Sequence, residues 1–192
     1  SVAFADRPAN VVLFVVDDMG WTDLGVYGSE FYETPTIDRL AGEGVRFTDA
    51  YAAGHVCSPT RASLLTGKSP ARLKLTDWLP GRRSIASEPL IEAAKLAALP
   101  LTEVTLAEAF KAQGYRTGIF GKWHLGNDGF GPIQQGFDVH VPQWNACCPG
   151  GGYYPPYKMK GLTQAGIEDE YVTDRVSKLA VEFIQKSGHQ PF

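Results

Sequence analysis

Residues 10–18 read Asn-Val-Val-Leu-Phe-Val-Val-Asp-Asp, an apolar run that ends in two carboxylates. An unbroken, Val-rich run of this kind is typical of a strand buried on both faces of a parallel sheet. It is far shorter than the roughly 20 apolar residues that span a bilayer, so it predicts no membrane span. Because ligands of open α/β sheets collect at the carboxyl ends of strands, Asp17 and Asp18 mark a candidate site.

Helix and strand signals alternate along the rest of the sequence. Capping residues, proline at helix starts and helical spacing of apolar residues predict four helices, at 34–41, 58–67, 105–114 and 173–186. The other segments are two weaker strands, 45–51 and 115–120, and two irregular stretches, 68–100 and 121–161. The alternation predicts an α/β fold in which helices flank a mostly parallel sheet.

Composition excludes several classes of protein. Of the 192 residues, 44% are apolar and 20% are charged, as in globular domains and unlike collagens, coiled coils or disordered tails. The formal net charge of -3 gives no general electrostatic reason to expect nucleic acid or a membrane surface as a partner. Three cysteines, Cys57, Cys147 and Cys148, do not make a disulfide scaffold, and their odd number leaves at least one for another role.

The two ends of the sequence carry further signals. Residues 1–9 are interpreted as a tail, and Ala3-Phe4-Ala5 resembles the end of a secretory signal peptide, which predicts a periplasmic or secreted protein. Residues 187–191 predict a turn, after which an alternating α/β chain begins another strand. We therefore expect residues 10–192 to be the N-terminal portion of a domain whose sheet is incomplete at the C-terminus.

Asp17 and Asp18 form the first of three groups of reactive residues at predicted strand ends. Adjacent carboxylates at a buried strand end repel each other and therefore need a cation. Ligands that are all oxygen atoms favour a hard ion, Ca²⁺ or Mg²⁺. The competing interpretation is a turn or a helix cap, because Asp-Asp-x-Gly is common in turns.

Residues 57–61, Cys-Ser-Pro-Thr-Arg, form the second group. Ser58-Pro59 is typical of a helix cap followed by proline at the first helical position. A helix that begins at Ser58 or Pro59 places Cys57 just before its N-terminus, where free N–H groups and the helix dipole bind oxyanions. Arg61 lies one turn further on and adds a bidentate fork suited to phosphate or sulfate. The competing interpretation is a buried cysteine beside a helix cap.

Lys122 and His124 form the third group, directly after the predicted strand 115–120. On extended chain they share a face; lysine neutralises an anion, and histidine can donate a proton to a leaving group. The competing interpretation is a surface lysine and a loop histidine. Together the three groups supply carboxylates for a cation, a nucleophile position and anion binders, which is the equipment for hydrolysing a charged oxyanion ester.

The motifs resemble those of the type I sulfatases. Residues 57–67, Cys-Ser-Pro-Thr-Arg-Ala-Ser-Leu-Leu-Thr-Gly, are similar to the first signature of that family. Residues 114–118, Gly-Tyr-Arg-Thr-Gly, with 121–126, Gly-Lys-Trp-His-Leu-Gly, are similar to the second, and 17–21, Asp-Asp-Met-Gly-Trp, resemble its first metal motif. Residues 75–78, Leu-Thr-Asp-Trp, resemble the arylsulfatase and N-acetylgalactosamine-6-sulfatase branch.

The resemblance implies an alkaline-phosphatase-like α/β fold, with residues 10–192 as the N-terminal portion of a sulfatase catalytic domain. It implies that a formylglycine-generating enzyme converts Cys57 to formylglycine. The hydrated aldehyde, a geminal diol, would attack the sulfur of a sulfate monoester and then expel sulfate. The substrate is expected to be a sulfated small molecule or glycan.

The same resemblance implies a role for each site residue. Cys57, Arg61, Lys122 and His124 are the catalytic residues: Arg61 would stabilise the diol, Lys122 would bind sulfate, and His124 would contact the diol or the sulfate. Asp17, Asp18 and the modified Cys57 would bind Ca²⁺, with Mg²⁺ as the other possibility.

The sequence departs from the family in length. Members are much longer, and an Asp-Asn metal-ligand pair, a further histidine and a lysine come from later segments that these 192 residues do not contain. We therefore expect the 192 residues alone to bind Ca²⁺ weakly and to turn over nothing. Two alternatives stay open. One is a phosphonate or phosphodiester hydrolase of the same superfamily. The other is a non-catalytic relative whose Cys57 stays a thiol and which only binds sulfated glycans.

The second cysteine-bearing segment, residues 147–154, reads Cys-Cys-Pro-Gly-Gly-Gly-Tyr-Tyr. One interpretation is an aromatic lining for a substrate cleft, and the other is a loop with two unpaired thiols or a vicinal disulfide. A zinc ion shared by Cys57, Cys147 and Cys148 has no supporting ligand spacing.

Overall fold

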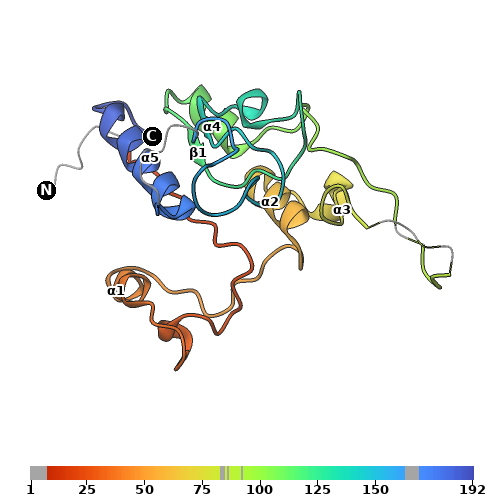
Figure 1. The fold of residues 1–192 in the computed structure, drawn as a ribbon, viewed down its shortest axis with the longest axis horizontal. Coiled ribbons are helices and arrows are strands. Elements are labelled where there is room, and N and C mark those ends of the chain that lie inside the picture. The colour runs from red at the N-terminus through yellow and green to blue at the C-terminus, as the bar shows by residue number, and fades with distance from the viewer. Residues whose placement is uncertain (1–7, 83–84, 86, 92, 163–168) are drawn as a thin grey trace, which may run out of the picture. The chain divides into compact units, whose positions relative to one another are not determined.

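The computed structural model describes residues 8–82, 85, 87–91, 93–162 and 169–192 (Figure 1). The segment that resembles the end of a signal peptide falls within residues 1–7, outside the described residues. The chain forms two compact units, one of residues 13–52 and one of residues 1–12 with 53–192. Within the described part, no helix is long and apolar enough to cross a membrane.

The unit of residues 13–52 is held together by polar contacts. It contains the 3₁₀ helix η1 (Gly25–Tyr27) and the helix α1 (Pro35–Glu43). The Asp38 carboxylate accepts hydrogen bonds from the Val26 N–H (2.8 Å) and from the Thr34 hydroxyl (3.0 Å). Leu24 is the only buried side chain of this unit, all of whose residues are described. Hydrogen bonds of Asp38 therefore hold α1 against η1, in place of the apolar packing that usually joins two helices.

The larger unit contains the other elements. These are α2 (Cys57–Thr66), α3 (Pro70–Leu73), α4 (Leu106–Ala112), β1 (Gly118–Phe120), η2 (Pro132–Gln135), β2 (Val139–Val141) and α5 (Val172–Ser187). The two strands pair in parallel, with Ile119 opposite His140. Helix α5 packs beside β1 (Figure 1), with the rings of Phe120 and Phe183 5.4 Å apart. These elements confirm an α/β fold with a parallel sheet.

Two apolar clusters form the core of the larger unit. The first joins α2, α3 and the loop after β1, and its buried residues are Ala62, Leu73, Leu75, Leu79, Leu99, Trp123 and Leu125. The second lies under α5, and its buried residues are Tyr157, Met159, Leu162 and Val172. Because the first cluster takes side chains from both α2 and residues 123–125, it holds those two segments against each other.

Three helix predictions are confirmed closely by the structure. Helix α4 begins with the predicted capping box: the Thr105 hydroxyl accepts from the Glu108 N–H, and the Glu108 carboxylate accepts from the Thr105 N–H. The predicted helix 173–186 is α5, one residue longer at each end. The predicted helix 34–41 is α1, although the Thr34 hydroxyl donates to the Asp38 carboxylate and caps no N–H of α1.

The strand predictions were less accurate. Residues 10–16 and 45–51 form no strand, and the apolar side chains of both runs are exposed. A strand requires a neighbour along its length, whereas among the described residues the run 10–16 has a single backbone hydrogen bond to a distant segment, from the Val11 N–H to the Phe192 carbonyl (2.7 Å). The strand predicted at 115–120 is shortened to β1, and β2 lies in a region predicted to be irregular.

The Thr105 hydroxyl is expected to contribute to stability beyond its cap, because it also donates to the buried Gln135 carbonyl (2.7 Å). Replacing Thr105→Ala removes both bonds and should lower the free energy of unfolding by about 1–2 kcal/mol. Thr105→Ser keeps the hydroxyl and should cost much less. Urea unfolding of the three proteins measures the difference, and equal losses for Ala and Ser would contradict this account.

Candidate active site

Helix α2 presents Cys57 in its first turn. The helix begins at Cys57, one residue earlier than predicted, and Val56 precedes it without a side-chain cap. Ser58, Pro59 and Ala62 are its buried residues, so this side of α2 faces the core and fixes the orientation of its first turn. Ser58 was predicted to be the helix cap, and this was wrong: its hydroxyl bonds to a different part of the chain.

The loop after β1 is anchored on both sides of His124. Trp123 and Leu125 are 1% and 0% exposed and belong to the first core cluster. The Trp123 indole donates to the Phe130 carbonyl (2.9 Å), and the Leu125 carbonyl accepts from the Leu99 N–H (2.8 Å). With both neighbours inside the core, the His124 side chain is directed toward α2.

Cys57 and His124, 67 residues apart in sequence, meet at this point. The Cys57 sulfur lies 3.1 Å from Nδ1 of His124, and Nε2 of His124 bonds to the Leu79 carbonyl. A carbonyl oxygen only accepts, so Nε2 carries the hydrogen and Nδ1 of the neutral ring is the acceptor that faces residue 57. With the ring neutral, the cysteine thiol is therefore the donor and His124 the acceptor.

Arg61 connects α2 to the same loop. Its Nη1 donates to the Lys122 carbonyl at 2.7 Å, and both residues are partly buried. Hydrogen bonds thus join the two segments that contain the predicted residues Cys57, Arg61, Lys122 and His124. The first turn of α2, which carries Cys57, and Arg61 one turn further on supply the kinds of group that bind an anionic ligand at a helix N-terminus.

The two predicted metal ligands belong to the other unit. Asp17 and Asp18 are exposed, and Asp18 has a positive φ of 58°. Among the described residues, no cluster of three or more His, Cys, Asp or Glu side chains is placed to hold a metal ion. The oxygen atoms of two adjacent carboxylates are suitable ligands for a hard cation. They would supply two of the six to eight oxygen ligands that Ca²⁺ takes.

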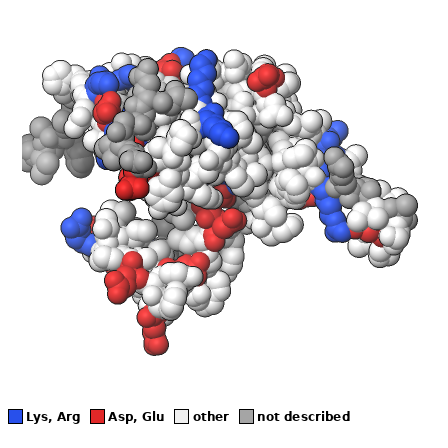
Figure 2. Space-filling model, viewed as in Figure 1, with Lys and Arg blue, Asp and Glu red and all other residues white. Residues whose placement is uncertain are grey.

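Charge is distributed unequally between the two units. Residues 13–52 contain two basic residues, Arg39 and Arg46, and eight acidic residues: Asp17, Asp18, Asp23, Glu30, Glu33, Asp38, Glu43 and Asp49. Since the formal net charge of the whole chain is -3, the rest of the chain carries +3. Figure 2 shows acidic side chains gathered on the unit of residues 13–52. The acidic unit carries the candidate cation ligands, and the basic remainder carries the candidate anion binders.

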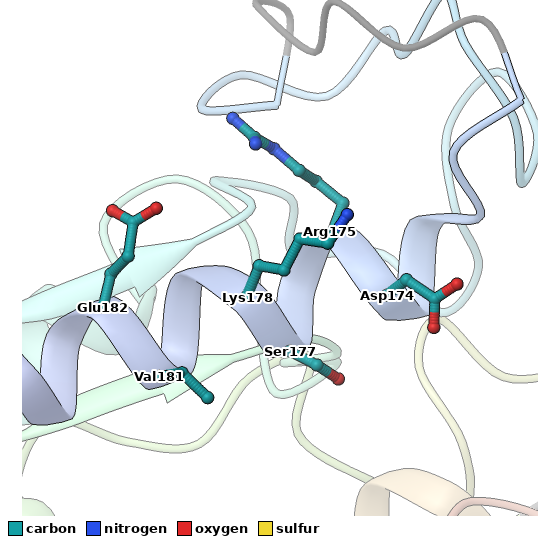
Figure 3. A pocket seen from close by; sticks show the side chains of 6 residues that line it. All are labelled: Asp174, Arg175, Ser177, Lys178, Val181 and Glu182. Carbon is teal, nitrogen blue, oxygen red and sulfur yellow. The ribbon is translucent and has the colours of Figure 1, made fainter.

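Two cavities of the larger unit lie outside this cluster. One, of about 590 Å³, follows the side of α5 and is lined by Asp174, Arg175, Ser177, Lys178, Val181 and Glu182 (Figure 3). It contains none of the predicted site residues. The other, of about 360 Å³, is lined partly by His140 and Asn145. Burial lowers the pKa of His140 to about 4, so this ring is neutral near pH 7.

The segment 147–154 contains two thiols that are not joined. The sulfurs of Cys147 and Cys148 are 3.0 Å apart, well beyond the bonded distance of about 2.05 Å. Tyr153 and Tyr154 both pack against the Tyr171 ring, with centroids 6.0 and 5.5 Å away. Cys147 and Cys148 thus form no vicinal disulfide. The two tyrosines of the segment pack against Tyr171.

Three further residues support the cluster, and sequence reasoning did not assign them to it. Ser58, Leu79 and Asn145 each bond to His124, the last through its carbonyl to the His124 N–H (3.1 Å). Leu79 and Asn145 bond to His124 through their backbone carbonyls. Because every residue has a backbone carbonyl, the residue types in the sequence do not indicate these contacts. The signal at Ser58 was interpreted as a helix cap, so its true partners could be found only from the packing.

Comparisons with known proteins agree with the motifs. The family model described as Sulfatase matches residues 9–192. Arylsulfatase A from Bos taurus is 46% identical over 69% of this chain and 25% of its own length. N-acetylgalactosamine-6-sulfatase from Sus scrofa is 43% identical over 100% of this chain and 39% of its own length. The crystal structure of Ps i-CgsB has a TM-score of 0.76 at 30% identity, over 97% of this chain and 44% of that one.

Burial of Leu125 is expected to be the main anchor of the loop that carries His124. Leu125→Ala should lower the free energy of unfolding by about 2–5 kcal/mol, because it empties a fully buried site. Leu101→Ala is the matched control: that leucine is 48% exposed, and its loss should cost less than about 0.5 kcal/mol. Urea unfolding of both variants measures these values, and a small cost at Leu125 would contradict the anchoring role.

Proposed function

We propose, since the chain belongs to the sulfatase family, that it is part of a sulfuric ester hydrolase that cleaves sulfate monoesters. The observation that carries this proposal is the contact of Cys57 with Nδ1 of His124, beside an arginine bonded to the Lys122 loop. The chain spans 25% and 39% of the two curated relatives described above. Residues 10–192 are accordingly proposed to be the N-terminal portion of the catalytic domain.

Residue 57 is proposed to act as formylglycine, made from Cys57 by a formylglycine-generating enzyme. One hydroxyl of the hydrated aldehyde would bond to sulfur as the S–O bond to the alcohol breaks and the alcohol leaves. The second hydroxyl would then lose its proton, and sulfate would leave by cleavage of its C–O bond as the aldehyde re-forms. The thiol of Cys57 stands in for one of these hydroxyls, and its surroundings fit an O–H donor because Nδ1 of His124 is an acceptor at 3.1 Å. His124 is thus placed to receive the proton of a hydroxyl on residue 57.

Arg61 and Lys122 are proposed to bind the negative charge of the substrate. Arg61 is held to the Lys122 carbonyl, so one bond already orients its guanidinium. Free N–H groups at the start of α2 add a positive dipole on the same side. Fixed positive groups of this kind stabilise the charge that develops in the transition state, which is the largest contribution in many hydrolases.

Asp17, Asp18 and residue 57 are proposed to hold Ca²⁺, or Mg²⁺. The carboxylates fit a hard cation, and their unit is the acidic one. When bound, such an ion polarises a sulfate oxygen and lowers the cost of its negative charge. Asp17 and Asp18 contribute negative charge and oxygen ligands, and the remaining ligands would come from other groups.

The substrate is proposed to be a sulfated small molecule or glycan, because one relative is named an arylsulfatase and another an N-acetylgalactosamine-6-sulfatase. These names agree with the branch indicated by residues 75–78. A periplasmic or secreted location is proposed from the signal-peptide-like sequence Ala3-Phe4-Ala5.

Modification of Cys57 can be tested directly in protein from its natural host. Trypsin releases the peptide 47–61, which contains Cys57, and we expect its mass to match formylglycine or the hydrate. The whole protein should hydrolyse an aryl sulfate, and Cys57→Ala should reduce turnover by about a thousandfold or more. Cys147→Ser should leave turnover unchanged.

The same experiments separate the alternatives. A modified peptide with faster turnover of an aryl phosphonate than of the sulfate would identify a phosphonate hydrolase. An unmodified cysteine with no turnover, together with binding of a sulfated glycan, would identify a non-catalytic relative. Either result would overturn the proposed activity.

The cation proposal predicts unequal effects of two kinds of carboxylate substitution. In the metal-free whole protein, Asp17→Asn or Asp18→Asn should weaken Ca²⁺ binding at least about tenfold, because each removes a charged ligand. Glu30→Gln removes an exposed carboxylate of the same unit and should have little effect. Calorimetric titration with Ca²⁺ and then Mg²⁺ measures the affinities; unchanged binding in both Asp variants would rule these ligands out.

A further inference from the structure

The Ser58 hydroxyl joins three segments of the larger unit. Ser58 is fully buried; its Oγ donates to the His124 carbonyl (2.9 Å) and accepts from the Leu79 N–H (3.1 Å). The Leu79 carbonyl in turn accepts from Nε2 of His124. Ser58, Leu79 and His124 therefore form a closed ring of hydrogen bonds, in which one hydroxyl is both donor and acceptor.

The backbone at His124 needs this support. Its φ is 58°, a left-handed conformation that costs a residue other than glycine free energy. Two bonds hold the backbone there: the His124 N–H donates to the Asn145 carbonyl, and the His124 carbonyl accepts from Ser58. Loss of the Ser58 bond would remove one of these two hydrogen bonds, which act together with the burial of Trp123 and Leu125 to set the direction of the ring.

The ring of His124 depends on Ser58 in a second way. In the neutral ring Nε2 carries the hydrogen because it faces the Leu79 carbonyl. The backbone of residue 79, whose side chain lies in the first core cluster, is in turn held by the bond from its N–H to Ser58. Only this tautomer leaves Nδ1 as an acceptor toward residue 57. The hydroxyl thus controls both the direction of the ring and the nitrogen that it presents.

We propose that Ser58 is a positioning residue: its hydroxyl holds Leu79 and His124 so that Nδ1 of His124 faces residue 57 as a proton acceptor. The catalytic consequence rests on the proposed sulfatase function, whereas the effect on the tautomer does not. The Cys-x-Pro-x-Arg pattern leaves position 58 open, so this role follows from the hydrogen bonds and not from the motif.

Substitutions at two serines of α2 separate this role from packing. Ser58→Ala removes the hydroxyl, while Ser58→Thr and Ser58→Val form a pair of similar shape in which only Thr keeps it. Ser63→Ala is the matched control, because the buried Ser63 hydroxyl has no hydrogen-bond partner among the described residues. Thermal unfolding and the mass of the peptide 47–61 verify that each variant is folded and equally modified.

The first measurement is the ¹⁵N spectrum of the histidine rings in the whole protein, with His124 assigned by loss of its signals in His124→Gln. We expect the parent protein, Ser58→Thr and Ser63→Ala to show hydrogen on Nε2 of His124, and Ser58→Ala and Ser58→Val to show a mixture of tautomers. Hydrogen on Nδ1 in the parent protein would overturn the proposal even if every Ser58 variant failed to fold.

The second measurement is turnover of an aryl sulfate. Loss of the hydroxyl should lower kcat by about 10- to 100-fold with KM changed less than about twofold, because a displaced proton acceptor affects the chemical step. Ser58→Thr should recover most of kcat. Unchanged tautomer and kcat in Ser58→Ala would overturn the positioning role, whereas a changed tautomer in a protein without sulfatase activity would instead contradict the proposed function.

Discussion

Burial of Trp123 and Leu125 on either side of His124 is the constraint on which the rest of the candidate site depends. Two large side chains enter the same core within three residues, and the residue between them adopts a left-handed conformation. Ala62 of α2 enters that core as well, so the packing that fixes the loop also fixes the helix. The contact between Cys57 and His124 is a consequence of this shared core.

The two units use different means of stabilisation, and the difference matches their proposed roles. The larger unit buries apolar side chains in two clusters, and the first of them holds α2, which carries Cys57 and Arg61, against the loop that carries His124. The unit of residues 13–52 relies on the Asp38 network and exposes most of its acidic groups. Rigid positive groups suit an anionic substrate, and exposed carboxylates suit a cation.

The sequence predicted helices correctly where the signal and the helix involve the same few neighbouring residues. The capping box at Thr105 and the apolar spacing of α5 each involve residues within a few positions of one another, and both helices form as predicted. The run 10–16 needed a neighbouring strand, which its own residues cannot specify, and it forms no ladder. Strand β2 was missed because its three residues, Val-His-Val, are too short for a periodic pattern.

The sequence by itself determined the α/β class and the family, and it nominated the residues of the candidate site, because motifs record residue types at fixed spacing. Only the tertiary structure decided which atoms face one another. It showed that the Ser58 hydroxyl bonds to Leu79 and His124 and not to the start of its own helix, and that Nδ1 of His124 faces Cys57. These partners are separated by 21 to 67 positions, so packing of the core, and not local spacing, brings them together.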